Sequence, residues 1–414
     1  MKTTANINFY NQLLRFLIYL NSAIILVPDQ FKGVPIALLL LVVIVRYLKL
    51  NQKPVLETKK FVISISFFII LLISIAYSSD INFAMRKLET GLSLVVFPLI
   101  FYIVGADKAL LTEKSIQTLK LTFIFSLVFF LISTFLFFYF TEPFYTFKST
   151  LIHYTNLVDI RIKHFEIHSI YLSICIGVAI IFTLSIIGNC GPSLKKALFF
   201  VLILLITFIA ILNKKGPIIF LGIVGLIFLI KNKSNYKHIL YISSISAILI
   251  LFILYVPKYN NVNRFKELFN IENNKNSSTA IRIQIYECAL KKIAQSPYFG
   301  YGWGDTKMVL NDCYEQKNVD FLNKNYNSHN QFLSILLSTG LLGFFTFIYY
   351  FFYLFKISNK KESQILFLLT LYFCLNMLTE NILEREDGVI IISLFINILL
   401  FKPNKERDVL SNKI

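Results

Sequence analysis

The polar stretch from about residue 259 to 341 contains two side chains with complementary chemistry, Arg282 and His329. An arginine guanidinium stays charged at every relevant pH and binds two phosphate oxygens at once. A histidine ring accepts a proton from a hydroxyl near neutral pH. A reaction in which a hydroxyl displaces a diphosphate needs both groups, a base for the attacking oxygen and a cation for the leaving group. This stretch is therefore the candidate site.

Arg282 opens a segment with helical periodicity, which has apolar residues at positions 283, 285, 289, 290 and 293. The polar residues 276–279 before it are suited to capping a helix. The sequence predicts Arg282 in the first turn of a short amphipathic helix at a membrane surface. A cation there opposes the helix macrodipole, and a bound anion would relieve that misfit. Taken alone, the pattern fits an ordinary surface arginine better.

His329 precedes an apolar run, so we expect it at the N-terminus of a helix, where the dipole favours the neutral, proton-accepting ring. Between the two residues lies Phe-Gly-Tyr-Gly-Trp-Gly at 299–304, which contains Trp303, the only tryptophan of the chain. Its glycines either bring backbone N–H groups close to a ligand or form a tight turn. A nucleotide-binding loop is not predicted, because no strand precedes it and no Gly-Lys-Ser/Thr follows.

Two other polar segments carry cations. The segment from about 141 to 168 contains Arg161, His164 and His168; it is either a solvated loop with snorkelling cations or the mouth of a site for an anionic lipid headgroup. The short turn at 213–216 carries Lys214 and Lys215, which are either helix-end lysines or point charges for a phosphate. The sequence leaves both alternatives open.

Composition indicates the elements that must hold these residues. The chain is 56% hydrophobic and 15% charged, with a mean hydropathy of +0.66, which is typical of a polytopic membrane protein. About 20 apolar residues cross a bilayer as a helix. About twelve such runs occur, near 13–28, 33–49, 61–78, 89–105, 119–140, 168–188, 196–212, 216–231, 238–256, 330–355, 364–379 and 388–402. We read the first as a retained helix and not a cleaved signal peptide.

Lysines and arginines are distributed unequally between alternate loops. Of the 41 Lys and Arg residues, 21 fall on one predicted side and nine in the short loops opposite. The positive-inside rule then places both termini in the cytoplasm and the long loop outside. We therefore predict an all-α integral membrane protein with helices one to nine in 1–256, an outward loop in 257–328, and helices ten to twelve with a tail in 329–414. The net charge of +18 reflects these loops and not nucleic-acid binding.

The five cysteines are divided between helices and the outward loop. Cys175, Cys190 and Cys374 lie in or beside helices as packing residues. Cys288 and Cys313 lie in the outward loop, where an oxidising compartment would permit a disulfide, but sequence alone does not fix their separation. No Cys and His spacing resembles a metal site, and no cofactor is predicted.

The motifs of this loop, taken together, resemble those of the O-antigen ligases and the related O-antigen and exopolysaccharide polymerases. The matching pattern is Arg282-x-x-x-Tyr286, Ser296-Pro-x-x-Gly300-x-Gly302, and His329-Asn330 followed by Gly340-Leu-Leu-Gly343, with Asn-Arg-Phe at 263–265 before it. The resemblance implies a metal-independent, inverting glycosyl transfer from an undecaprenyl-diphosphate-linked glycan.

The resemblance also implies roles for single residues. His329 matches a histidine that helps to deprotonate the acceptor hydroxyl, and Arg282 matches an arginine that binds the diphosphate. Lys215, with Lys214 beside it, stands where the family has an arginine, so the charge is kept and the planar fork is lost. Arg264 is a further candidate for the diphosphate. Candidates for the acceptor or a lipid headgroup are Arg161, His164, His168, Trp303 and Asn330.

These observations favour an O-antigen ligase-type enzyme of the bacterial inner membrane, which transfers the glycan to a hydroxyl of lipid A-core or a similar acceptor at the periplasmic face. Length and the Asn-Arg-Phe stretch favour a ligase over a repeat-unit polymerase that uses a lipid-linked acceptor. A polysaccharide flippase or other transporter is the alternative from another class; it predicts functional polar residues inside the bundle. A membrane scaffold protein would tolerate the loss of Arg282 and His329.

Overall fold

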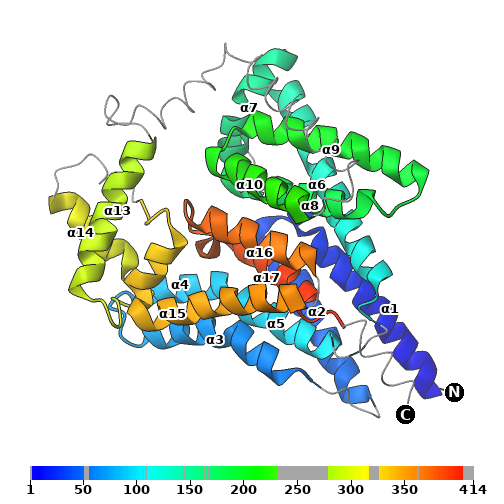
Figure 1. The fold of residues 1–414 in the computed structure, drawn as a ribbon, viewed down its shortest axis with the longest axis horizontal. Coiled ribbons are helices and arrows are strands. Elements are labelled where there is room, and N and C mark those ends of the chain that lie inside the picture. Colours follow the sequence, from blue (N-terminus) through cyan, green and yellow to red (C-terminus); the bar gives the residue numbers. More distant parts are fainter. Residues whose placement is uncertain are drawn as a thin grey trace.

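The structure, a computed structural model, consists of helices and their connections throughout the part of the chain that it describes (Figure 1). That part comprises residues 2–50, 56–105, 107, 110–142, 146–161, 164–165, 167–231, 278–316, 326–360 and 363–403. The predicted span 238–256 and the candidate Arg264 lie outside these residues. The predicted all-α class is confirmed.

The helices follow one another along the chain with short connections. Their bounds are α1 Lys2–Ser22, α2 Gly33–Lys49, α3 Thr58–Ile75, α4 Ile81–Gly91, α5 Ser93–Val104, α6 Glu113–Thr141, α7 Phe147–Arg161, α8 Ser169–Ile187, α9 Pro192–Leu212, α10 Lys215–Lys231, α13 Ser278–Gln295, α14 Thr306–Gln316, α15 Gln331–Lys360, α16 Gln364–Met377 and α17 Glu386–Leu400. The short 3-10 turns η1 Ile24–Leu26, η2 Asp29–Phe31 and η4 Ile382–Glu384 lie in connections.

Among the described residues, seven helical segments are long and apolar enough to cross a membrane, and α16 is a shorter apolar helix. This supports a polytopic membrane protein, whereas the predicted number of twelve spans is not confirmed. The predicted span 89–105 is divided into α4 and α5, which meet at Leu92. Three helices were missed, α4 over most of its length, α7 inside the predicted loop 141–168, and α14, because none of them contains a long apolar run.

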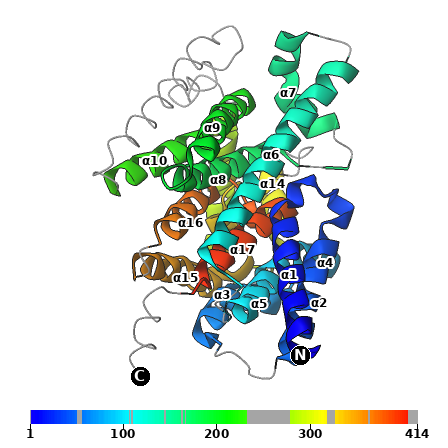
Figure 2. The ribbon, with the colours of Figure 1, turned by 90° about the vertical axis from the view of Figure 1, so that its right-hand side faces the viewer.

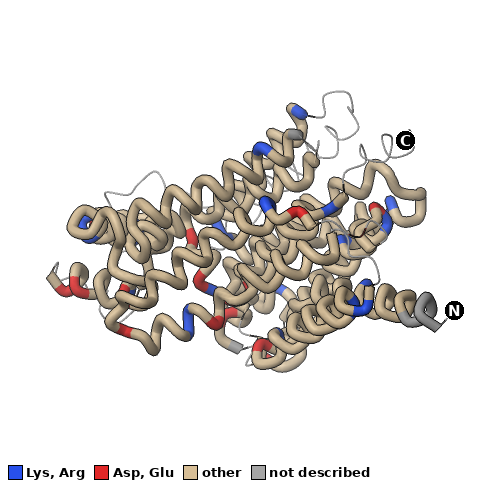
Figure 3. Tube along the Cα trace, turned by 90° about the horizontal axis from the view of Figure 1, so that it is seen from below, with Lys and Arg blue, Asp and Glu red and all other residues tan. Residues whose placement is uncertain are grey.

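Two helices form the centre of the bundle. Every residue of α17 from Gly388 to Leu400 is buried, and α8 is buried over most of its length. Figures 1 and 2 show α16 and α17 between one group of helices, α6 to α10, and a second group made of α2 to α5 with α15. Charged residues gather at helix ends and connections, while long stretches of the helices carry none (Figure 3). This is the distribution that a bilayer requires.

Connections predicted on the outward side meet at one end of the bundle. The amide of Asp29 donates to the carbonyl of His164 at 2.9 Å. The amide of Asp80 donates to the carboxylate of Asp305 at 2.8 Å. Helices α13 and α14 lie at this end, far from the start of α1 (Figure 1).

Connections predicted on the cytoplasmic side meet one another in the same way. Arg46 at the end of α2 pairs with Asp107, and Lys402 after α17 pairs with Glu113 at the start of α6. Connections that the charge distribution assigns to the same side of the membrane are therefore in contact with one another. Which group faces the cytoplasm stays a prediction.

The glycine-rich loop at 297–302 fits into a break in α15. Gly340 has φ 61° and ψ −158°, which interrupts the helix. The carbonyls of Leu337 and Ser338 accept hydrogen bonds from the amides of Tyr301 and Gly302 at 2.8 and 2.9 Å. In return, the amide of Leu341 donates to the carbonyl of Pro297 at 2.8 Å. The break thus loses few hydrogen bonds, because the loop replaces the partners that a continuous helix would supply.

The next residues of this loop bind α3 and its end. The amide of Trp303 donates to Ser74 Oγ at 3.1 Å and that of Gly304 to Ser78 Oγ at 3.0 Å. Gly300 donates to the carbonyl of Ser296 at 3.2 Å. The backbone amides of residues 300–304 all bind protein groups, so the loop is a packing device and not a ligand cradle.

We predict that Gly340→Ala lowers the stability of the protein by about 1–3 kcal/mol, because alanine is strained at this positive φ. Its Cβ would also overlap the backbone of Tyr298. Thermal unfolding of the purified chain in detergent measures the effect. The matched control is Gly222→Ala in α10, where a Cβ meets nothing within 4 Å and no loss is expected. Equal melting temperatures for the two variants would contradict the assignment.

Candidate active site

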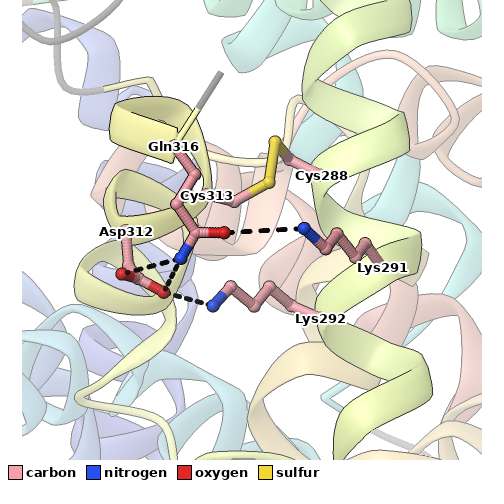
Figure 4. The surroundings of a disulfide bond; sticks show 6 residues. All are labelled: Cys288, Lys291, Lys292, Asp312, Cys313 and Gln316. Atoms are coloured by element: carbon pink, nitrogen blue, oxygen red, sulfur yellow. Dashed lines mark hydrogen bonds and ion pairs between the residues drawn. A yellow bond between two sulfur atoms is a disulfide. The ribbon is translucent and has the colours of Figure 1, made fainter. Parts of the chain in front are cut away.

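Helices α13 and α14 form a cross-linked pair that carries Arg282. A disulfide joins Cys288 of α13 to Cys313 of α14, with their Cα atoms 5.8 Å apart, which decides the alternative that the sequence left open. Lys292 of α13 pairs with Asp312 of α14 beside it (Figure 4). This ion pair lowers the pKa of Asp312. The disulfide and the ion pair together hold α13 against α14.

Arg282 lies one turn further along its helix than predicted. Helix α13 begins at Ser278, so Arg282 is in the second turn and not in the first. Because the unpaired amides of a helix are concentrated in its first turn, the expected conflict between Arg282 and the macrodipole is weaker than the sequence suggested.

A carboxylate bridges the two residues that the sequence singled out. Arg282 Nη2 donates to Glu380 Oε1 at 2.6 Å, and His329 Nδ1 lies 3.4 Å from Glu380 Oε2. The Glu380 side chain is 9% exposed, whereas those of Arg282 and His329 are 29% and 24% exposed. Glu380 is therefore the buried member of the cluster, whereas Arg282 and His329 are partly exposed to solvent.

Tyr286 supports the cluster from the same face of α13, since it follows Arg282 by four residues. Its hydroxyl lies 3.2 Å from the carbonyl of His329 and 3.1 Å from that of Leu378. Burial raises the pKa of Tyr286, and the charge of Glu380 adds to the rise against the opposing effect of Arg282. The hydroxyl consequently stays protonated and donates at neutral pH.

The backbone at His329 is in the left-handed region, with φ 43°. A residue with a side chain pays roughly 1 kcal/mol or more for this conformation, and it persists where the surroundings require it. The side chain of Asn327 accepts the amide of His329 at 3.1 Å. Asn330 then caps α15, where its Oδ1 accepts the amides of Phe332 and Leu333 at 2.9 and 3.2 Å. The left-handed backbone of His329 therefore lies just outside α15, which begins at Gln331.

The turn with Lys214 and Lys215 lies next to this cluster. Helix α10 begins at Lys215, and a Cβ on Gly216 would lie 2.9 Å from the hydroxyl of Thr379, the neighbour of Glu380. Lys214 Nζ is 3.9 Å from Asp159 Oδ2. The structure therefore brings this turn, α13 and the start of α15 to one place.

His168 caps α8 nearby, and its Nδ1 accepts the amide of Ile170 at 3.3 Å. Burial lowers the pKa of His168; Asp159 opposes this effect, and Lys214 and Arg385 add to it. The ring is therefore neutral at neutral pH.

The remaining candidates are placed differently. Trp303 is 5% exposed and packs edge-on against Phe68 in the interior. His164 is exposed, and its carbonyl binds the connection before α2. Arg161 is the last residue of α7, and its side chain is outside the described part. The structure does not bring Trp303 or His164 to Glu380.

Glu380 is the residue that sequence reasoning missed. It is 98 residues from Arg282 and 51 from His329, beyond the range of any local pattern. The available signal was a carboxylate directly after an apolar run that ends near Thr379. Acids at such positions also occur as ordinary solvated residues, so only the contacts distinguish Glu380.

Comparison with known families bears directly on this cluster. Residues 199–348 match the family model of O-antigen ligase. This part of the chain is therefore similar to the O-antigen ligases. The matched O-antigen ligase region runs from α9 into α15 and contains Lys214, Lys215, Arg282 and His329, whereas Glu380 lies beyond it. No curated protein matches the chain.

We predict that Glu380→Gln reduces glycan transfer roughly 100-fold, because the amide neither balances the charge of Arg282 nor orients a proton on His329 Nδ1. Surface glycan from cells that carry only the variant measures the effect, with membrane protein level checked by immunoblot. Glu315→Gln on the exposed side of α14 is the matched control and should retain transfer. Normal transfer by Glu380→Gln would remove Glu380 from the site.

Proposed function

We propose that the chain is an O-antigen ligase-type glycosyltransferase. It transfers a glycan from undecaprenyl diphosphate to a hydroxyl of lipid A-core, or of a similar acceptor, at the periplasmic face of the bacterial inner membrane. The observation that carries the proposal is the Arg282–Glu380–His329 cluster, which joins a cation to a base through one buried carboxylate. The match of residues 199–348 to the O-antigen ligase family model supports the reaction class.

Arg282 is suited to the diphosphate leaving group. Its contact with Glu380 uses one terminal nitrogen, and a guanidinium has five N–H donors. The remaining donors can bind phosphate oxygens while Glu380 holds the side chain in place. The turn with Lys214 and Lys215, at the start of α10, lies beside Thr379 and would bring further positive charge near the diphosphate. Charge that develops on the diphosphate is thereby stabilised as the glycosidic bond breaks.

His329 is suited to activate the acceptor. With the proton on Nδ1 directed at Glu380, Nε2 has a lone pair that can accept the proton of the attacking hydroxyl. Glu380 stabilises the imidazolium that forms, and it is a positioning residue because it acts through His329. The hydroxyl oxygen then bonds to the anomeric carbon, from the face opposite the departing diphosphate, which inverts the configuration.

The second candidate function is a repeat-unit polymerase of the same superfamily, with a lipid-linked glycan as acceptor. A ligase and a polymerase would use the same cluster, so only the identity of the acceptor distinguishes the two functions. The transporter alternative places functional polar groups inside the bundle, whereas this cluster lies at the ends of α10, α13, α15 and α16. The described structure therefore favours an enzyme over a transporter.

The deciding experiment is a gel of surface lipopolysaccharide from the native host lacking this gene, beside an extract of its undecaprenyl-linked intermediates. A ligase leaves long chains on undecaprenyl diphosphate and none on lipopolysaccharide. A polymerase leaves core that bears a single repeat. An unchanged gel would contradict both assignments.

We predict that His329→Ala and Arg282→Ala each abolish transfer in a folded, inserted protein, because one loses the base and the other the diphosphate ligand. Arg282→Lys should keep partial activity if charge alone suffices, and lose it if the planar fork is required. Complementation of the deletion strain, scored on the same gel, measures all three variants. Wild-type glycan in either alanine variant would refute the mechanism.

A further inference from the structure

The residues next to His329 and Glu380 contact each other. Ser328 directly precedes His329, and Asn381 directly follows Glu380 in the turn between α16 and α17. Ser328 Oγ lies 3.1 Å from both Oδ1 and Nδ2 of Asn381. Ser328 and Asn381 are each 1% exposed. A buried polar contact therefore joins the segment that carries the histidine to the turn that carries the carboxylate.

The direction of this hydrogen bond follows from the donors present. The Ser328 hydroxyl has one hydrogen, and it donates to the carbonyl of Asn330 at 2.9 Å. Asn381 Nδ2 therefore donates to Ser328 Oγ. Loss of the serine hydroxyl would leave the amide of Asn381 buried without this partner, which is costly away from water. The contact accordingly resists a shift of the segment relative to the turn.

Two further side-chain contacts hold the same parts of the chain together. Gln331 Oε1 accepts the amide of Leu383 at 2.8 Å, and the Ser334 hydroxyl donates to Glu384. Each contact links the first turn of α15 to η4. Both contacts are further along the chain from the histidine and the carboxylate than the Ser328–Asn381 contact is. The Ser328–Asn381 contact therefore has the most direct effect on the separation of those two groups.

The turn is also held from α8. The hydroxyl of Tyr171 donates to the carbonyl of Asn381 at 3.1 Å, and this hydrogen bond is buried. Since α8 is itself buried over most of its length, Tyr171 is a fixed point in the bundle. Asn381 is thus held at its backbone by Tyr171 and at its side chain by Ser328.

The contact between His329 and Glu380 is sensitive to small displacements. His329 Nδ1 lies 3.4 Å from Glu380 Oε2, which is long for a hydrogen bond. His329 precedes the first residue of α15, so its backbone is not part of the regular helix. A shift of the segment would therefore separate the two groups, and a proton on Nδ1 would lose its acceptor.

We propose that Asn381 and Ser328 are positioning residues that hold the ring of His329 against Glu380. The neutral ring then keeps its proton on Nδ1 and presents the lone pair of Nε2 to the acceptor hydroxyl. Tyr171 contributes by holding Asn381 from α8. The role in transfer rests on the proposed function, whereas the placement of His329 against Glu380 does not.

The test is the tautomer of His329, measured by solid-state NMR on the full chain in lipid bilayers with isotope-labelled histidine. The chain has five histidines, and His329→Gln identifies the signal of this one. At about pH 9 a histidine ring is neutral, and the nitrogen chemical shifts show which nitrogen carries the proton. We expect the Nδ1–H form to prevail in the wild-type protein. Ser328→Ala should lower the ratio of the Nδ1–H to the Nε2–H form roughly three- to tenfold, which is equivalent to about one hydrogen bond.

Further variants separate positioning from stability. Ser328→Ala combined with Asn381→Leu removes both polar partners of the contact, so the melting temperature should recover while the ratio stays low. Tyr171→Phe removes one hydroxyl and keeps the ring, and it should lower the ratio even if Ser328→Ala does not fold. Ser338→Ala is the matched control, because Ser338 is also 1% exposed and its hydroxyl donates to the carbonyl of Ile335 within α15. The ratio should not change in this control.

A wild-type ratio in Ser328→Ala or in Tyr171→Phe would overturn the inference. A ratio that recovers together with the melting temperature in the double variant would overturn it as well, since it would show a role in stability alone. Complementation with Ser328→Ala should give roughly ten- to hundredfold less transferred glycan, because a displacement of about 1 Å has an effect of this size. Undiminished transfer would overturn the role in the reaction. Failure of the proposed function shows instead in the gel of the deletion strain, which involves none of these variants.

Discussion

The site depends on one buried carboxylate. Glu380 is held at the end of α16, and its two oxygens approach different partners, Arg282 from α13 and His329 from the start of α15. Helices α13 and α15 also meet directly, since the Tyr286 hydroxyl lies 3.2 Å from the carbonyl of His329. A buried acid without partners would be costly, so the same electrostatic requirement that stabilises Glu380 also fixes the separation of the cation and the base. The contacts that fix the geometry of the site are therefore also contacts that stabilise the folded bundle.

A second constraint is the opening of α15 at Gly340. The loop at 297–302 fills the break, and this contact ties the region after α13 to the transmembrane helices. The disulfide between Cys288 and Cys313 then holds α14 to α13. Much of the motif that signals the superfamily therefore serves packing. Gly300, Gly302 and Gly340 all have positive φ, and they allow the close approach of two backbones where a side chain would not fit.

The two sides of the 327–329 segment carry different groups. On one side Arg282 of α13 and His329 contact the buried Glu380, and on the other the Phe83 ring lies among lysines. His329, whose backbone is left-handed, contacts Glu380, while Asn327 and Ser328 line a small cavity on the other side. Local backbone strain at a position of this kind is typical of functional sites.

The sequence by itself determined the membrane class, most helix positions and the grouping of connections, and it singled out Arg282 and His329 as candidate residues. It could do so because a bilayer demands long apolar runs and because charge chemistry restricts which side chains bind phosphate or accept protons. Only the tertiary structure decided the contacts of Glu380 with Arg282 and His329, the packing function of the glycine loop and of Trp303, the Cys288–Cys313 bond, and the helices α7 and α14. These features depend on contacts between residues far apart in the chain, which no local periodicity or spacing records.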